Sequence, residues 1–385
     1  MILDFTLSLI FLLAQARLAT LALKRIRGWE QRRQPAARAG LAFLGTLIAA
    51  GYACTFAEVT GHFPGSARVA PVLGAITFCY LLTSTAALAV STALGPLRRR
   101  LDRQADLGRR RVLRLAGNAI VAAPFAALGY GALVKRTDVQ VCEIDLPLPG
   151  LPAALDGLRL LQLSDIHLSV FLTERELARM IDAACELRPH IAFATGDFIS
   201  TFGDPLEACI RQLARVKADA GMFGCLGNHE HYARAEQAAV DLAARAGIPI
   251  LRGEARQLRF GNAVVNIAGV DYQPLFRKEE YLRGAGRLVY PGALNLLLSH
   301  NPDVFPVAAR QGYDLTLAGH THGGQVTVEI LDQSINPARF FTPYVQGLYR
   351  EGPRAVYVTR GLGTIGIPAR LGAPPEISLL RLRKA

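Results

Sequence analysis

Leu317-Ala-Gly-His-Thr-His-Gly-Gly-Gln325 is the stretch that decides the fold of this chain. Residues 313–317 before it alternate between polar and apolar side chains, which is typical of a strand that ends here. In an extended segment His320 and His322 would point the same way, because side chains at positions i and i+2 share a face. The glycines beside them let the backbone turn sharply. Alone, the pair fits two solvated loop histidines better than a site, so its interpretation depends on the rest of the chain.

Four more expected strands also end in residues that can ligate metals. These ends are Asp165-Ile166-His167 after residues 158–163, Gly196-Asp197 after 190–194, Gly227-Asn228-His229-Glu230 after 222–226, and Ser299-His300 after 294–298. Helical patterns occupy 173–187, 205–216, 233–246 and 302–310, and further strands are expected at 139–146, 258–269, 355–359 and 377–382. The alternation favours an α/β sandwich with the helices outside. In such folds, sites gather at the carboxyl ends of strands.

The side chains at these ends have the chemistry of a metal centre. They include five of the eight histidines, together with carboxylates and one amide oxygen. This mixture suits Mn, Fe or Zn better than Ca or Mg. Seven ligands exceed the needs of one tetrahedral ion, but they suit two ions about 3.5–4 Å apart that share a carboxylate, clamp a phosphate and generate hydroxide near neutral pH. His231 is expected to be a loop histidine, and His62 and His190 to be structural.

The five motifs, in this order, resemble the calcineurin-like metallophosphoesterase superfamily. The resemblance covers roughly residues 139–385 and implies a four-layer αββα sandwich with two mixed sheets. The tail Thr359-Arg-Gly-Leu-Gly-Thr-Ile-Gly-Ile-Pro-Ala-Arg370, followed by Pro375-Glu-Ile377, is similar to the membrane-associated YkuE/YaeI-like branch. Gly323-Gly-Gln325 fits that branch as well.

The resemblance also implies a role for each site residue. The expected ligands of a first divalent metal ion are Asp165, His167, Asp197 and His322, and those of a second are Asn228, His300 and His320, with Asp197 bridging. His229 would lie near the scissile phosphate, stabilise developing charge and protonate the leaving oxygen. The implied reaction is in-line hydrolysis of a phosphoester or phosphoanhydride by metal-bound hydroxide, without a covalent enzyme intermediate. Arg360 and Arg370 are candidates for binding the phosphate or its lipid partner, and ordinary surface arginines are the alternative.

Two long irregular segments, 271–288 and 331–354, are expected near this site. The second combines aromatic residues with Arg339 and Arg350, so it is either a packed loop or a contact with a bilayer interface or a lipid head group. Membrane attachment favours envelope substrates, such as phospholipids, lipid-linked pyrophosphates or nucleotide-activated lipids. The resemblance to the branch implies a phosphodiesterase.

The N-terminal third has the composition of a membrane region. Residues 1–134 contain 16 basic and 5 acidic side chains, a net charge of +11, whereas residues 135–385 contain 27 and 26, a net charge of +1. The basic excess therefore belongs to the first part, and the remainder has no basic stripe or finger spacing that would indicate nucleic-acid binding. Apolar runs at about 5–23, 41–57, 69–94 and 112–134 are each near the ~20 residues that cross a bilayer. We expect a four-helix transmembrane region at 1–134 and a catalytic domain at 135–385, with the first run a retained anchor rather than a cleaved signal peptide.

Charge predicts the orientation of this region. Residues 24–38 contain six Lys or Arg and residues 98–111 contain seven, whereas residues 61–68 contain one. The positive-inside rule places the two rich loops in the cytoplasm and the C-terminal domain outside it. Arg109-Arg-Arg-Val-Leu-Arg114 resembles a twin-arginine export signal, with an ordinary Arg-rich stop as an equal alternative.

Two other functions remain open at this stage. The helices could form a transporter or sensor that the metal domain regulates, although the runs contain few ionisable groups away from their ends. The domain could also be a metal-binding scaffold without turnover. Six scattered cysteines favour small apolar filler, and four of them could form up to two disulfides in an extracytoplasmic domain.

Overall fold

The computed structural model describes residues 2–59, 69–104, 107–275, 277–330 and 333–385. His62 and the whole 61–68 loop lie outside these residues. The chain divides into two compact units, Met1–Ala132 and Leu133–Ala385, which are considered separately.

The first unit consists of long apolar helices. They are α1 (Ile2–Arg27), α2 (Gln34–Val59), α3 (Val69–Gln104) and α4 (Leu107–Leu133), with a short 3-10 turn η1 (Gln31–Arg33). In the described residues, four helical segments are long and apolar enough to cross a membrane: Thr6–Arg27, Gln31–Cys54, Val69–Leu101 and Gly108–Thr137. Large apolar side chains such as Leu12 (67% exposed) and Phe43 (71% exposed) face outward, as lipid-facing residues do.

Helices α1, α2 and α3 pack through small and polar residues. The rings of Phe11 and Phe78 meet edge to face with centroids 5.8 Å apart, and the Gln15 amide donates to Ser84 Oγ at 2.9 Å. Gly51 lies so close to Thr77 that a Cβ on it would sit 1.9 Å from the threonine hydroxyl. Small residues and interhelical hydrogen bonds of this kind are the usual basis of helix association in membranes.

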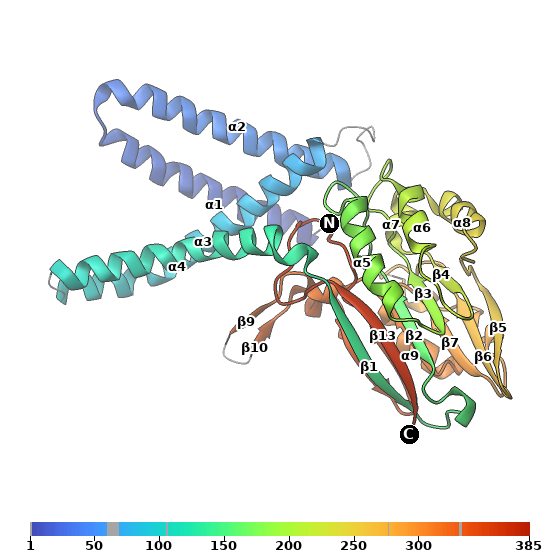
Figure 1. Ribbon diagram of the computed structural model, residues 1–385. Helices are drawn as coiled ribbons and strands as arrows, with labels where there is room; N and C mark the ends of the chain where they lie inside the picture. The colour runs from blue at the N-terminus through green and yellow to red at the C-terminus, as the bar shows by residue number, and fades with distance from the viewer. Residues whose placement is uncertain (1, 60–68, 105–106, 276, 331–332) are drawn as a thin grey trace. The chain divides into compact units, whose positions relative to one another are not determined.

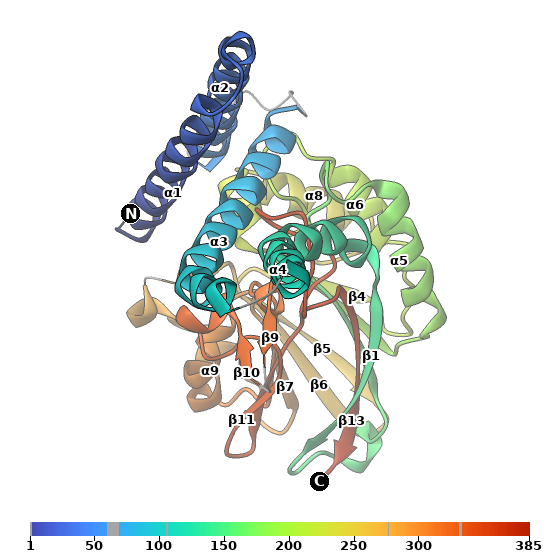
Figure 2. The ribbon, with the colours of Figure 1, turned by 90° about the vertical axis from the view of Figure 1, so that its left-hand side faces the viewer.

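The second unit contains two mixed sheets. The first has the strand order β1-β13-β2-β3-β4 and the second β11-β12-β8-β7-β6-β5, with a separate β9–β10 hairpin. The strands are β1 (Gln140–Leu148), β2 (Arg159–Leu163), β3 (Ile191–Thr195), β4 (Met222–Cys225), β5 (Glu254–Phe260), β6 (Ala263–Gly269), β7 (Leu294–Leu298), β8 (Leu315–Ala318), β9 (Val328–Ile330), β10 (Gln333–Ile335), β11 (Gly347–Glu351), β12 (Arg354–Val358) and β13 (Glu376–Lys384). Strands β2, β3 and β4 are parallel, as are β6, β7, β8 and β12. Figure 2 shows β1 beside its parallel partner β13.

Helices cover the outer faces of both sheets. They are α5 (Glu174–Glu186), α6 (Leu206–Leu213), α7 (Asn228–Tyr232), α8 (Glu236–Arg245) and α9 (Phe305–Gln311). Short 3-10 turns are η2 (Lys135–Thr137), η3 (Ala153–Leu155), η4 (Lys278–Glu280), η5 (Ala285–Leu288), η6 (Pro302–Val304), η7 (His322–Gly324) and η8 (Pro337–Phe340). In Figure 1, α5, α6 and α8 lie along one side of the β2–β4 strands.

Three layers of apolar side chains hold this unit together. One core joins the first sheet to α5, α6 and α8, through residues such as Leu161 and Ile181. A second fills the space between the sheets, where Phe193 faces Leu296 and Leu317 across the sandwich core. Smaller clusters join the second sheet to α9 and its neighbouring turns. The structure therefore confirms the four-layer αββα sandwich, preceded by four apolar helices.

Two local expectations need correction. The strand expected at 258–269 is a hairpin, β5 and β6, that pairs Phe260 with Ala263 across a Gly261-Asn262 turn. The first strand of the domain runs to Leu148 instead of ending before Pro147, because a proline at an edge strand removes no required hydrogen bond.

Candidate metal centre

The site lies where five strands end. Asp165 and His167 follow β2, Asp197 follows β3, and Asn228 and His229 open α7 just after β4. From the second sheet, His300 follows β7, and His320 and His322 follow β8. The structure brings seven of these residues together, although they span more than 150 positions of sequence, and Asn228 precedes one of the seven, His229.

Their ligand atoms form three overlapping groups, each able to hold an ion: Asp165, His167 and His322; His167, Asp197 and His229; and Asp197, His300 and His320. Within each group the atoms lie within 4.8 Å of one another. His167 Nε2 lies 3.1 Å from His322 Nε2 and 3.5 Å from Asp197 Oδ2. His300 Nε2 lies 3.0 Å from the same Asp197 oxygen. Asp197 therefore belongs to both halves of the site.

Hydrogen bonds on the far side of the rings orient the histidines. His300 Nδ1 donates to the Thr195 carbonyl at 2.7 Å, and His229 Nδ1 donates to the Ser200 carbonyl at 2.6 Å. Donation by Nδ1 leaves Nε2 unprotonated and directed elsewhere in the neutral ring. Backbone acceptors of this kind are typical behind metal-binding histidines.

A buried oxygen of the site lacks a hydrogen-bond partner. Asn228 Oδ1 is buried and unpartnered among the described residues, whereas His300 Nε2 lies 3.0 Å from the Asp197 carboxylate. An unpartnered buried acceptor costs about 1–3 kcal/mol. A cation bound by Asn228 Oδ1 would remove this cost, so the donor set fits divalent metal ions.

Burial and opposite charges shift the pKa values strongly. Burial alone would lower the pKa of His300, but the Asp197 and Asp165 carboxylates raise it to about 10. Burial would raise the pKa of Asp197, yet the charges of His300 and His229 bring it well below its ordinary value. For His320, burial and the neighbouring His300 charge together lower the pKa to about 3. Burial raises the pKa of Asp165, so Asp197 is the carboxylate that its neighbours hold in the negatively charged form that attracts cations.

The backbone that carries these side chains is unusual. The φ angles of Asp165, His167, Asp197, His320 and His322 are 50°, 48°, 55°, 74° and 52°. These values lie in the left-handed region, which is rare for residues other than glycine and marks functional sites. The expectation of an extended 320–322 segment is therefore wrong. A turn, and not strand alternation, aims His320 at Asp197 and His322 at Asp165.

Glycines permit close packing around the two carboxylates. A Cβ on Gly227 would lie 2.1 Å from Asp197 Oδ1, and one on Gly319 would lie 2.2 Å from Asp165 Oδ2. Neither space admits a side chain.

Glu230 also supports the site, although sequence reasoning gave it no role. Its carboxylate is fully buried and accepts the backbone N–H groups of Asp197, Phe198 and Gly227 at 2.9, 2.7 and 2.8 Å. It joins the turn after β3 to the turn after β4. The available signal is a glutamate three residues after a helix-starting glycine, because a carboxylate at that position can accept the N–H of the N-cap residue.

The two arginine candidates lie in different environments. Arg370 is fully buried, and its guanidinium donates to the His322 carbonyl at 2.9 Å and to the Gly363 carbonyl at 2.9 Å. The same group lies 3.2 Å from His322 Nδ1. Burial lowers its pKa to about 9. Arg360 forms an ion pair with Glu376 at 2.7 Å. Arg370 thus contacts His322 directly and is placed to fix the position of its ring.

Tyr272 is a neighbour of the site that the sequence did not indicate. Its ring centroid lies 6.4 Å from that of His300 and 5.8 Å from that of His320. Burial raises its pKa, and Tyr232 adds to the shift. It is the third residue after the end of β6, at the same edge of the second sheet.

The other two described histidines, and the cysteines, belong to none of the three groups. His190 Nδ1 accepts the Arg159 N–H at 2.9 Å, and exposed His231 pairs with Glu236 at 2.7 Å. All six cysteines lie in described residues and are free thiols.

Comparison with known proteins agrees with this geometry. The family described as calcineurin-like phosphoesterase matches residues 158–324. The chain is 28% identical to the uncharacterized metallophosphoesterase YkuE of Bacillus subtilis, over 72% of this chain and 98% of that protein. It is 31% identical to a transmembrane protein with metallophosphoesterase domain of Danio rerio, over 72% of this chain and 63% of that protein. It is 30% identical to the phosphodiesterase YaeI of Escherichia coli, over 58% of this chain and 82% of that protein.

Proposed function

The chain belongs to the calcineurin-like metallophosphoesterase superfamily, in its YkuE/YaeI-like branch, and we propose that it is a membrane-anchored phosphodiesterase or pyrophosphatase with two metal ions. The observation that carries the proposal is the set of three overlapping ligand groups around Asp197. In addition, Asn228 Oδ1 is a buried acceptor without a hydrogen bond, which a bound cation would satisfy.

We assign the ligands from two of these groups and add Asn228. Asp165, His167 and His322 would hold the first ion, His300, His320 and Asn228 would hold the second, and Asp197 would serve both. His229, which belongs to the remaining group, is left for the substrate. Mn, Zn and Fe fit this mixture of nitrogen and oxygen donors. Bound divalent ions would polarise the phosphoryl group and supply hydroxide near neutral pH.

His229 is the proposed catalytic residue of the protein itself. Its ring lies edge to face with His167, with centroids 4.7 Å apart, and like His320 it is half-buried, whereas the other proposed ligands are buried. Its Nδ1 is committed to the Ser200 carbonyl, which leaves Nε2 for a substrate oxygen. As an imidazolium with a proton on both nitrogens, it would stabilise charge on the phosphoryl group and donate the Nε2 proton to the leaving oxygen.

We further propose an envelope phosphate, such as a phospholipid, as the substrate class. Two features support it: the four apolar helices, and the exposed rings of Phe340 (84%) and Phe341 (54%) beside exposed Arg339. Aromatic and basic residues together favour a bilayer interface. In the same 331–354 segment, the ring of Tyr344 packs on that of Phe305 with centroids 5.7 Å apart. Only part of this segment is therefore free to contact lipid. The basic loops of the first unit favour an extracytoplasmic catalytic domain.

The test is hydrolysis by the full-length protein in detergent. After chelation, Mn, Zn, Fe, Mg and Ca are added back singly, with bis-p-nitrophenyl phosphate and p-nitrophenyl phosphate as substrates. We expect metal-dependent turnover that favours the diester. Asp197→Asn should abolish it while the protein stays folded by circular dichroism. Metal binding without turnover of any phosphate, lipid-linked substrates included, would instead support a scaffold.

A further inference from the structure

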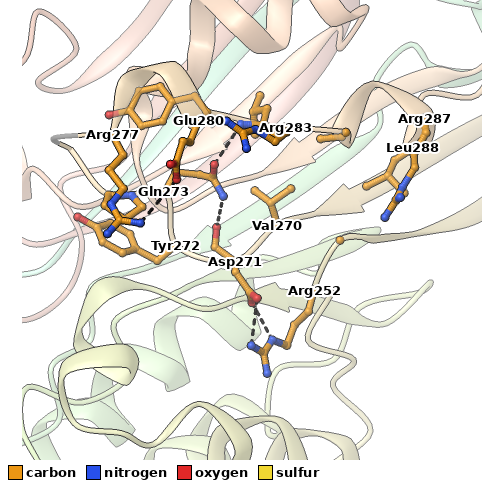
Figure 3. Close-up of a pocket in the computed structure, with 16 residues that line it drawn as sticks. Arg252, Val270, Asp271, Tyr272, Gln273, Arg277, Glu280, Arg283, Arg287 and Leu288 are labelled. Carbon is orange, nitrogen blue, oxygen red and sulfur yellow. Dashed lines mark hydrogen bonds and ion pairs between the residues drawn. The ribbon is translucent and has the colours of Figure 1, made fainter.

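A pocket of about 360 Å³ opens beside the second half of the metal centre. It lies between the end of β6 and the turns η4 and η5, and Figure 3 shows its lining. Its volume falls within the range of small-molecule sites.

Tyr272 connects this pocket to the metal centre directly. Its side chain lines the pocket, and its ring is the one that contacts His300 and His320. A group bound in the pocket would therefore lie next to the proposed second metal site.

Asn301 forms a second connection. It follows His300, and its amide donates to the Gln273 carbonyl at 2.7 Å and to the Tyr281 hydroxyl at 3.1 Å. Gln273 and Tyr281 both line the pocket. Asn301 thus fixes Gln273 and Tyr281 in the pocket wall, and it is adjacent in sequence to the proposed ligand His300.

The far wall is held in a strained conformation. Leu282 has a φ of 52° although its side chain is branched and buried, and such a conformation persists only where its surroundings enforce it. The Gln273 side chain accepts the Leu282 N–H at 3.0 Å, and Gln311 donates to the Leu282 carbonyl at 2.9 Å. These two hydrogen bonds fix the backbone at Leu282, and thereby the direction in which the side chain of the next residue, Arg283, extends.

The lining has an excess of positive charge. Four arginines and two carboxylates line the pocket. Arg252 is committed to Asp271 through bonds of 2.7 and 3.0 Å, and Arg277 pairs with Glu280 at 3.7 Å. Within the described parts of the chain, the guanidinium groups of Arg283 and Arg287 form no ion pair or hydrogen bond. Figure 3 shows the Arg252–Asp271 pair and Arg283 on opposite sides of Val270.

We propose that this pocket binds a second phosphate group on the substrate, through Arg283 and Arg287, while the scissile phosphate occupies the metal centre. This inference rests on the proposed phosphodiesterase function and narrows its substrate class to esters whose organic group carries another phosphate. Guanidinium groups bind phosphate through paired charge-assisted hydrogen bonds.

The experiment uses the full-length, metal-loaded protein and two substrates that differ only in the second phosphate. They are thymidine 5′-(p-nitrophenyl phosphate) and the same ester with a 3′-phosphate, and both release p-nitrophenolate. The quantity measured is the ratio of their kcat/KM values. Wild type should prefer the 3′-phosphorylated ester roughly tenfold, since two partly exposed ion pairs contribute modestly.

Three variants test which residues cause the preference. R283Q/R287Q should hydrolyse the two esters with about equal kcat/KM. R283K/R287K should retain much of the wild-type preference for the 3′-phosphorylated ester, because the positive charges remain. Arg259→Gln, an exposed arginine on β5 outside the pocket, is the matched control and should keep the wild-type ratio. Circular dichroism verifies that each variant is folded.

Two results would overturn the inference. A wild type that hydrolyses bis-p-nitrophenyl phosphate without preferring the 3′-phosphorylated ester would refute the pocket's role and leave the phosphodiesterase proposal intact. The same holds if R283Q/R287Q keeps the wild-type ratio. Absence of hydrolysis of every ester would refute the phosphodiesterase proposal itself.

Discussion

Five proposed ligands hold left-handed backbone conformations, and this strain needs a compensating interaction. Each such residue costs of the order of 1 kcal/mol. Part of the compensation is visible: Glu230 fixes the turn at Asp197, and the Asp165 carboxylate accepts the His320 N–H at 2.9 Å. These hydrogen bonds hold the proposed ligands in place through the protein's own groups. We infer that the fold preorganises the site, as the proposed two-metal chemistry requires.

His229 and His231 offer a matched pair for testing catalysis. They lie on the same short helix, but His229 faces His167 whereas His231 is exposed and pairs with Glu236. We expect H229A to lower kcat by about 10²–10⁴-fold, the usual contribution of a general acid, with metal content unchanged by elemental analysis. H231A should retain wild-type kcat. Equal kcat in H229A and wild type would remove His229 from the mechanism.

Arg370 could either bind the substrate or position the proposed ligand His322, and a variant can distinguish these two roles. Its buried hydrogen bonds to His322 and Gly363 favour positioning. We expect R370K to weaken metal affinity about 10–100-fold, as loss of a residue behind a ligand does, and to lower the thermal midpoint because buried carbonyls lose their donors. Metal titration and thermal unfolding provide the two measurements. A raised KM with unchanged metal affinity and midpoint would indicate substrate binding instead.

At the scale of elements, α5 has a complete capping box. The Thr173 hydroxyl accepts the Glu176 N–H at 3.2 Å, the Glu176 carboxylate accepts the Thr173 N–H at 2.8 Å, and Arg136 pairs with that carboxylate at 3.2 Å. Burial alone would raise the pKa of Glu176, but these bonds lower it below 4.5. The carboxylate therefore stabilises the fold above its unfolded pKa, and this contribution is lost as the pH falls through its folded value.

We expect E176Q to lower the free energy of unfolding by about 1 kcal/mol at neutral pH. The difference from wild type should shrink below about pH 4.5, where the unfolded carboxylate gains its proton. Thermal unfolding in detergent with a chelator present would measure this without a contribution from metal loss. Glu186→Gln, at the exposed other end of α5, is the control. A difference that persists unchanged to acidic pH would show that Glu176 acts through packing alone.

The same scale explains what the sequence could and could not predict. Strand-end motifs such as Asp165-Ile166-His167 are local, so the ligand positions and the α5 helix could be predicted from neighbouring residues. The β5–β6 hairpin was missed because Gly261-Asn262 was read within one apolar run, although that dipeptide is a hairpin signal. The parallel pairing of β1 with β13, and the contact of Tyr272 with His320, depend on segments far apart in sequence, which no local pattern specifies. Left-handed turns at His320 and His322 are likewise imposed by tertiary contacts against local preference.

At the scale of the whole molecule, the first unit raises the question of which side of the membrane holds the site. Its charge is asymmetric: six Lys or Arg at residues 24–38 and seven at 98–111, against one at 61–68. Helices α1 to α4 separate these loops, so the rule places residues 24–38 and 98–111 on the cytoplasmic side together. An even number of spans then leaves the N-terminus and the second unit on the other side.

We therefore expect a protease added to intact Escherichia coli spheroplasts that express the full chain to digest the second unit. An epitope tag after Ala385 follows the digestion, and a cytoplasmic protein that stays intact verifies that the inner membrane is sealed. Full protection of the tag, with digestion only after detergent is added, would place the metal centre in the cytoplasm. That result would mean that the positive-inside rule fails for these loops. The substrate would then have to lie on the inner leaflet or in the cytoplasm, which would contradict the proposed location. Digestion in sealed spheroplasts would place the metal centre where phosphates of the outer leaflet are within reach.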